Sequence, residues 1–85
     1  MSSFMDFFAP PWPRNFPAEL RALNAKMEKR PGKMADHDER SEILFHIGNS
    51  QAAMVDFETA TNLEPDSDRR ELRFRELDDM KRRYS

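Results

Sequence analysis

Residues 36–62 read DHDERSEILFHIGNSQAAMVDFETATN, and this stretch decides which fold the sequence predicts. Its apolar residues recur at helical spacing along one face. They are Ile43, Leu44, Ile47, Met54 and Val55. Asp36 followed by Glu39 is typical of a helix start, because the two side chains can bond the free N–H groups of the first turn. We therefore predict one long central helix from about Asp36 to Asn62.

Gly48-Asn49 leaves a second interpretation of the same stretch open. This dipeptide could form the turn of a β-hairpin with strands over residues 42–47 and 50–57. Polar and apolar residues alternate poorly on both sides of it, so we favour the helix. On that helix Phe45 projects away from the main apolar face, next to the small residues Gly48 and Ala52. We expect this second apolar spot to contact a partner.

Two shorter helices are predicted on either side. The first begins at Asn15–Pro17, where proline suits the opening turn, and ends at Arg30 before Pro31-Gly32,. Leu63-Glu64-Pro65 interrupts the chain again,. A last helix follows from about Ser67 to Arg83, with Ser67 or Asp68 as its N-terminal cap.

The segment before these helices combines prolines with large aromatic side chains. Proline fixes φ and removes a backbone donor, so residues 9–13 favour an extended arm over a helix or a central strand. The aromatic residues of the segment are Phe4, Phe7, Phe8, Trp12 and Phe16. We predict an all-α fold of three helices with a long central helix, an arm over residues 1–16 and a helical domain over 17–85.

Length and composition predict a thin hydrophobic core. The chain has 85 residues, of which 38% are hydrophobic and 35% charged, and it has no cysteine that could form a disulfide. A core in a chain this short rarely contributes more than about 3–5 kcal/mol. Additional buried surface must then come from another chain, so we expect a homo-oligomer or a complex with a different protein.

Charge is distributed unevenly along the chain. Residues 1–33 hold six basic and three acidic side chains, 34–68 hold nine acids and only Arg40, and 69–85 hold seven bases and four acids. An acidic middle between two basic flanks can favour one packing order of the helices through their own attractions. A solvated surface with chance clustering is the other interpretation.

The residues that could carry chemistry do not form a convincing site. Asp36-His37-Asp38-Glu39 resembles metal-ligand composition, but consecutive helical residues point in different directions. Glu42 and His46 are one turn apart and supply only two ligands. We therefore expect no catalytic residue, no metal and no cofactor, and we predict that the chain is not an enzyme.

The C-terminal helix supports an alternative function. Its basic residues Arg69, Arg70, Arg73, Arg82 and Arg83 could contact a phosphate backbone in a nucleic-acid-associated regulator,. On a helical wheel these side chains scatter around the axis, and four acids are interleaved among them. Nucleic acid is therefore the less favoured partner, and a solvated, salt-bridged helix is the simpler interpretation.

The proline-aromatic arm gives the strongest functional signal. Large aromatic anchors on a preformed extended backbone dominate many interfaces, although the arm could instead fold back and complete its own core. We predict a non-enzymatic protein–protein interaction protein whose partner-binding residues are Phe4, Phe7, Phe8, Trp12 and Phe45.

Two weaker expectations concern where the protein acts. Short, highly charged chains of this kind are frequent among phage accessory proteins, either virion components or inhibitors of host machinery. The mean hydropathy is −0.92 and no apolar run approaches a membrane span,. The start of the chain has no basic region typical of a signal peptide. We expect a cytoplasmic protein, or a virion component, with no membrane partner.

Overall fold

The computed structural model describes residues 14–84, which form four helices and no strand. These helices are α2 (Phe16–Lys29), α3 (Met34–Ile47), α4 (Ser50–Leu63) and α5 (Ser67–Tyr84). The all-α prediction is confirmed for this part of the chain. Residues 1–13, on which the aromatic arm was predicted, lie outside the described residues.

The prediction of one long central helix is wrong, because the chain breaks at Gly48-Asn49. Gly48 adopts a left-handed conformation with φ of 97°, and its N–H donates to the carbonyls of Leu44 and Phe45. The Oδ1 atom of Asn49 then accepts a hydrogen bond from the backbone N–H of Ala52, at 3.2 Å. A glycine that ends one helix and an asparagine that caps the next together reverse the chain. The hairpin interpretation placed a turn here correctly, but it joined strands where the structure has helices.

The ends of the other helices also differ in detail from the predictions. The first helix begins where predicted, and the Asn15 side chain caps α2 by accepting a hydrogen bond from the Ala18 N–H at 3.1 Å. The cap of α5 is neither Ser67 nor Asp68. The Oδ1 atom of Asp66 accepts from two backbone N–H groups of the first turn instead. Helix α3 begins earlier than predicted, at Met34, so Asp36 lies inside its first turn.

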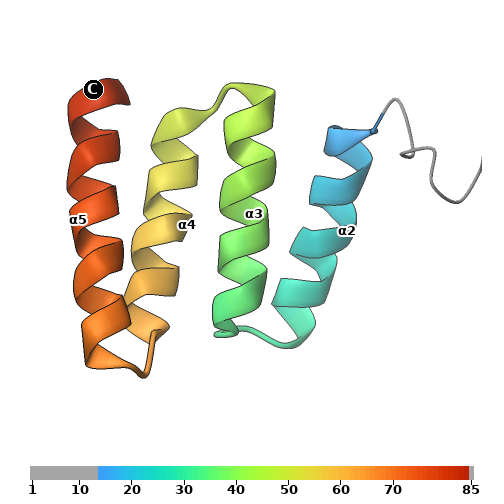
Figure 1. The fold of residues 1–85 in the computed structure, drawn as a ribbon. Helices are drawn as coiled ribbons and strands as arrows, with labels where there is room; N and C mark the ends of the chain where they lie inside the picture. Colours follow the sequence, from blue (N-terminus) through green and yellow to red (C-terminus); the bar gives the residue numbers. More distant parts are fainter. Residues whose placement is uncertain (1–13, 85) are drawn as a thin grey trace, which may run out of the picture.

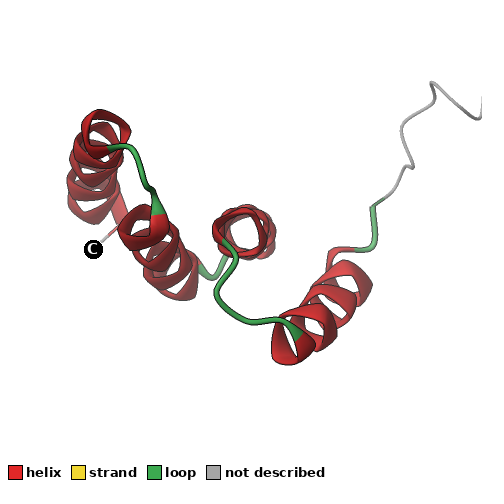
Figure 2. Ribbon diagram, turned by 90° about the horizontal axis from the view of Figure 1, so that it is seen from below, coloured by secondary structure: helices red, strands yellow, loops and turns green. Residues whose placement is uncertain are grey.

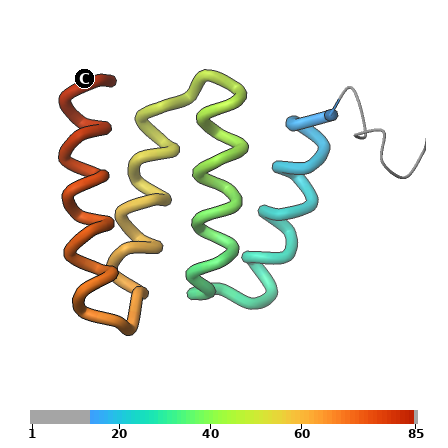
Figure 3. Tube along the Cα trace, viewed as in Figure 1, coloured from blue at the N-terminus to red at the C-terminus, as the bar shows by residue number. Residues whose placement is uncertain are grey.

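The four helices stand side by side in the order of the sequence (Figure 1). The chain reverses direction at each connection, so neighbouring helices are antiparallel (Figure 3). Seen along the helix axes in Figure 2, the array stays open, and α2 and α5 lie at its two ends. Among these helices, contacts join α2 to α3, α3 to α4 and α4 to α5, but not α2 to α4 or α5. The radius of gyration of 15.1 Å exceeds the ~12 Å expected for a compact domain of this length,.

The buried hydrophobic residues are few and come from all four helices, and one cluster of them lies between α2 and α3. Leu23, Met27 and Ile43 are buried together, with Phe16 and Leu20 packed against them. Phe16, Leu20, Leu23 and Met27 follow one another at spacings of four, three and four residues, so they form one apolar stripe on α2,. Ile47, which was predicted to lie on the buried face of the central helix, is 44% exposed because α3 ends at this residue.

Helices α3 and α4 pack closely because small residues lie at their crossing. Ala53 is fully buried, and the Ser41 hydroxyl donates to its backbone carbonyl at 2.8 Å. A side chain no larger than serine or alanine lets two helices approach until such a bond can form. This pair forms the centre of the array, with α2 on one side and α5 on the other.

A pair of isoleucine substitutions tests this core. Ile43 is 1% exposed, so Ile43→Ala should lower the free energy of unfolding by about 2–4 kcal/mol, through lost burial and a cavity,. Ile47→Ala, at a half-exposed helix end, should cost less than about 1 kcal/mol. Urea denaturation followed by circular dichroism measures both. Equal losses for the two variants would contradict the division of α3 and α4 at Gly48.

Candidate functional site

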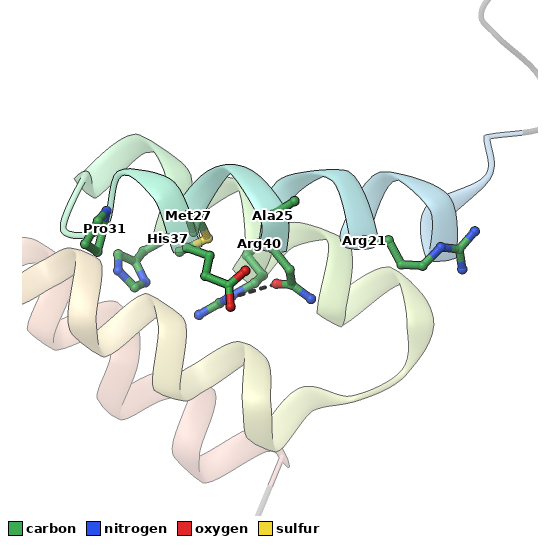
Figure 4. A pocket seen from close by; sticks show the side chains of 8 residues that line it. Arg21, Ala25, Met27, Pro31, His37 and Arg40 are labelled. Atoms are coloured by element: carbon green, nitrogen blue, oxygen red, sulfur yellow. Dashed lines mark hydrogen bonds between the residues drawn. The ribbon is translucent and has the colours of Figure 1, made fainter.

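A groove runs between α2 and α4, with α3 as its floor. Two hollows form it and share Asn24 and Arg40 as lining residues. One of about 360 Å³ is bordered by α2, α3 and α4, and one of about 660 Å³ by α2, α3 and the loop between them. The groove exists because α2 and α4 both pack on α3 but do not contact each other. In Figure 4, His37 and Arg40 of α3 lie in the space between the α2 and α4 ribbons.

The two ends of the groove differ in chemistry. The smaller hollow is lined by the aliphatic side chains of Leu20, Leu44, Ala52 and Val55 together with the polar side chains of Asn24, Arg40 and Asp56. Val55, in the wall of this hollow, is 65% exposed. The larger hollow presents the polar side chains of Arg21, Asn24, Glu28, His37 and Arg40, with Ala25, Met27 and Pro31 between them. An apolar strip beside a hydrogen-bonding end suits an extended segment of polypeptide.

A network of polar side chains fixes the floor of the groove. Asp56 of α4 is buried, and Arg40 of α3 donates two hydrogen bonds to its carboxylate, both at 2.8 Å. The Nδ1 atom of His37 lies within hydrogen-bond distance of the same carboxylate, 3.0 Å from its Oδ1 atom. Arg40 also donates to the Oδ1 atom of Asn24 on α2, at 2.9 Å. One arginine therefore joins three helices.

The charge state of Asp56 follows from these contacts. Burial alone disfavours the charged carboxylate, but the hydrogen bonds from Arg40 and His37 outweigh it and lower the pKa of Asp56 below its ordinary value of 3.8,. The same pairing raises the pKa of the Arg40 guanidinium. Asp56 is therefore ionised at neutral pH and acts as an acceptor in the network.

A second polar cluster holds α5 to the rest of the array. Arg73 donates two hydrogen bonds to the carboxylate of Asp38 on α3, both at 2.9 Å, and its Nε atom lies 3.3 Å from Glu64. Its guanidinium lies 5.6 Å from the ring centre of Phe57 on α4. These contacts raise the pKa of Arg73, chiefly through the bonds to Asp38. Arg73 thus connects α5 to α3 across the intervening helix.

The side chains of residues 36–39 point in different directions in the structure, because they occupy consecutive positions of one helix. Asp36 pairs with Lys26 at 3.3 Å, His37 with Asp56 and Asp38 with Arg73. Asp36 is buried, and its Oδ2 atom has no hydrogen-bond partner among the described residues. Within residues 14–84, no group of three or more His, Cys, Asp or Glu side chains is placed to hold a metal ion.

The predicted partner-binding residues fall into two groups. Phe4, Phe7, Phe8 and Trp12 lie outside the described residues. Phe45 is described, and its ring lies 5.4 Å from the ring of Tyr84 at the end of α5. Together with Met80, these two rings line a hollow of about 400 Å³ at the α3–α4 turn. Phe45 therefore packs against α5 and also borders a surface cavity.

The arginines predicted as a nucleic-acid surface are mostly engaged within the chain. Arg70 donates to the Glu64 carbonyl at 2.9 Å, and Arg73 belongs to the cluster described above. Arg82 and Arg83 both pair with Asp79, at 3.9 and 2.9 Å. Arg69 is exposed. The structure does not bring these five side chains together on one face of α5.

Sequence reasoning missed the pairing of Arg40 with Asp56. On one continuous helix, residues sixteen positions apart would lie about 24 Å from each other along the axis. The break at Gly48 brings them to 2.8 Å. The signal that could have revealed the pair is the charge itself, because Arg40 is the single base in an acidic stretch.

Comparison with protein-family models, with curated proteins and with solved structures finds no match. The described helices include none with both the length and the apolar character needed to cross a membrane. The groove and the polar clusters around it are therefore the evidence on which a function can be argued.

The Asp56 network gives a prediction about acid stability. The folded-state pKa of Asp56 is lowered, so its contribution to stability is present above the ordinary value of 3.8 and is lost as pH falls through the folded value,. Asp56→Asn should therefore lower the free energy of unfolding at pH 7 by about 1–3 kcal/mol. Its stability should also fall less than that of the wild type between pH 5 and pH 2.5.

Asp79→Asn is the matched control, since Asp79 pairs with Arg83 on the exposed surface of α5. Its cost at pH 7 should stay below about 1 kcal/mol. Chemical denaturation at a series of pH values measures all three proteins. If Asp56→Asn lost stability with acid as steeply as the wild type, the pKa assignment would be contradicted.

Proposed function

We propose that this protein is not an enzyme and acts by binding another protein chain, through its aromatic arm and the open faces of its helical array. The observation that carries the proposal is the groove between α2 and α4. Its aliphatic end includes Val55, which is 65% exposed although it lies beside buried core residues. Leaving such a strip in water is unfavourable, so its cover is expected to come from another segment of polypeptide.

The construction of the groove also supports a binding role. Its floor is held by hydrogen bonds from Arg40 to Asp56 and to Asn24, which join all three surrounding helices. A groove built on such a rigid frame loses little conformational entropy when a ligand enters. The hollow beside Phe45 and Tyr84 is a second apolar surface of the same array.

The alternative is a nucleic-acid-associated regulator that uses the arginines of α5. Intramolecular partners occupy Arg70, Arg73 and Arg83, and Asp79 and Glu71 add negative charge to the same helix. Phosphate contact would have to compete with these pairs. The alternative therefore has less support than protein binding, and the two differ in their response to salt.

A peptide-display experiment tests the proposal. The full chain, held at submicromolar concentration to limit self-association, is exposed to a library of random 12-residue peptides. We expect enrichment of peptides with aromatic and aliphatic anchors, whose affinity changes less than about threefold between 50 and 500 mM NaCl. Val55→Glu, which places a charge in the apolar end of the groove, should weaken binding at least tenfold. Leu72→Glu, at a comparably exposed position on α5, should have no effect.

A 20-base-pair DNA duplex serves as the competing probe, and its binding is measured by isothermal titration calorimetry. Duplex binding that weakens steeply with salt, is lost in an Arg69→Ala/Arg70→Ala variant and is unaffected by Val55→Glu would favour the nucleic-acid alternative. The proposal would also be contradicted if no selected peptide bound the wild type more tightly than it bound the Val55→Glu protein.

A further inference from the structure

We propose that the C-terminal end of α2 and the loop after it bind the phosphate backbone of a double-stranded nucleic acid, without reading its sequence. This is a second binding site, separate from the groove, and it does not depend on the proposed function. Its side chains, which we call the basic edge, are Lys26, Lys29, Arg30 and Lys33.

Positive charge is concentrated in this part of the chain. Residues 21–33 hold five basic side chains and one acid, a local charge of +4 in a protein whose net charge is −2. The acid, Glu28, lies beside Arg21 in the lining of the larger hollow. These two charges offset each other, so the excess belongs to the four residues of the basic edge, all of which are exposed.

The fold brings the four cations to one corner of the array. Lys26 precedes Lys29 by three positions and Arg30 by four, which makes their side chains neighbours on the helix surface. Lys26 also pairs with Asp36 of α3 at 3.3 Å. The backbone N–H of Asp36 donates to the carbonyl of Lys33 at 3.1 Å, so Lys33 lies at the same end of α2.

Most of these cations are available to a ligand. The side chains of Lys29, Arg30 and Lys33 form no hydrogen bond or ion pair within residues 14–84. Lys26, despite its pairing, keeps 59% of its side chain exposed. The arginines of α5 differ, because intramolecular acceptors already engage Arg73 and Arg83. A phosphate can therefore approach the basic edge while displacing at most one ion pair.

The surroundings of the basic edge favour a partner recognised by charge alone. The large hydrophobic side chains exposed on the described chain belong to α3, α4 and α5, and none belongs to α2 or the loop after it. Beside the cations, the exposed surface of α2 carries Ala22 and Ala25. Protein interfaces and membrane-bound helices both depend on large apolar anchors. This surface lacks such anchors, so neither class of partner fits it as well as a polyanion does.

Among polyanions, a nucleic-acid duplex has the highest fixed charge density. About 10 Å of duplex axis carries about six phosphate charges, and each phosphate that meets a cation releases a counterion. An acidic peptide would also have to lose backbone entropy on ordering, whereas a duplex is already rigid. Helix α2 lies at one end of the array and contacts no described helix except α3 (Figure 2). Its outer side is therefore open to a body as wide as a duplex.

Fluorescence anisotropy of a labelled 20-base-pair DNA duplex, titrated with full-length variants at several salt concentrations, tests the inference. Four phosphate contacts predict a slope of about −3.6 for the logarithm of the association constant against that of the salt concentration. Lys29→Ala/Arg30→Ala should make the slope shallower by about 1.8 and weaken binding at low salt at least tenfold. Circular dichroism should show an unchanged fold, since both side chains are exposed and unpaired.

Two further variants control for charge and position. Lys29→Arg/Arg30→Lys keeps both charges and should keep the wild-type slope. Arg82→Ala/Arg83→Ala removes the same charge from the last turn of α5, where both arginines pair with Asp79, and should also keep it. An RNA duplex of equal length offers the same phosphate chemistry, so binding of either duplex supports the site and the tighter one identifies the physiological class.

Three outcomes would overturn the inference. One is the absence of binding to either duplex at 25 mM NaCl. Another is an equal loss of slope in the Arg82→Ala/Arg83→Ala variant, which would place the contact on α5. The third is tighter binding to a poly-glutamate peptide or to vesicles containing phosphatidylserine than to the duplexes. The groove is scored separately, because Lys29→Ala/Arg30→Ala should still bind library peptides and Val55→Glu should still bind the duplex.

Discussion

The bidentate pairing of Arg40 with Asp56 is the interaction on which this architecture depends. It joins α3 to α4 through two hydrogen bonds of 2.8 Å, and the same guanidinium reaches Asn24 of α2. A buried carboxylate without such partners would be strongly destabilising, so α4 can pack on α3 only where this arginine meets it. The pair therefore sets the register of the two central helices. Because Arg40 also forms the groove floor, the interaction that stabilises the array also shapes its binding surface.

Some of the fold could be predicted from sequence because local signals are strong there. The stripe of Leu23 and Met27, the Asn15 cap and the stop at Pro31-Gly32 each depend on nearby residues, and α2 has nearly the predicted bounds. The break at Gly48 was missed because helical spacing on both sides of it resembles one continuous face. The groove was missed for the same reason, since its floor requires α3 and α4 to be antiparallel. Val55 is thus a groove residue that sequence periodicity had assigned to the core.

The distribution of charge explains the order in which the helices pack. Lys26 of the basic N-terminal third pairs with Asp36, and Arg73 of the basic C-terminal third pairs with Asp38 and Glu64. Each contact joins a flank of the chain to its acidic middle, which agrees with the first of the two interpretations of the charge pattern. At the start of α3, Asp36 therefore pairs with a residue of α2, and Asp38 pairs with a residue of α5. This arrangement places α3 and α4 at the centre and leaves α2 and α5 at the ends.

The ends of the array limit how it can associate. A serial arrangement of helices could in principle extend by stacking further copies on its terminal helices, as helical repeats do. The outer surface of α5 carries Arg75, Glu76, Asp79 and Arg82 around Leu72, so stacking there would bury several charges,. In the hollow between α2 and α4 the charged lining residues are Arg40 and Asp56, which already pair with each other. A bound segment would therefore bury fewer charged side chains at the side of the array than on the outer surface of α5.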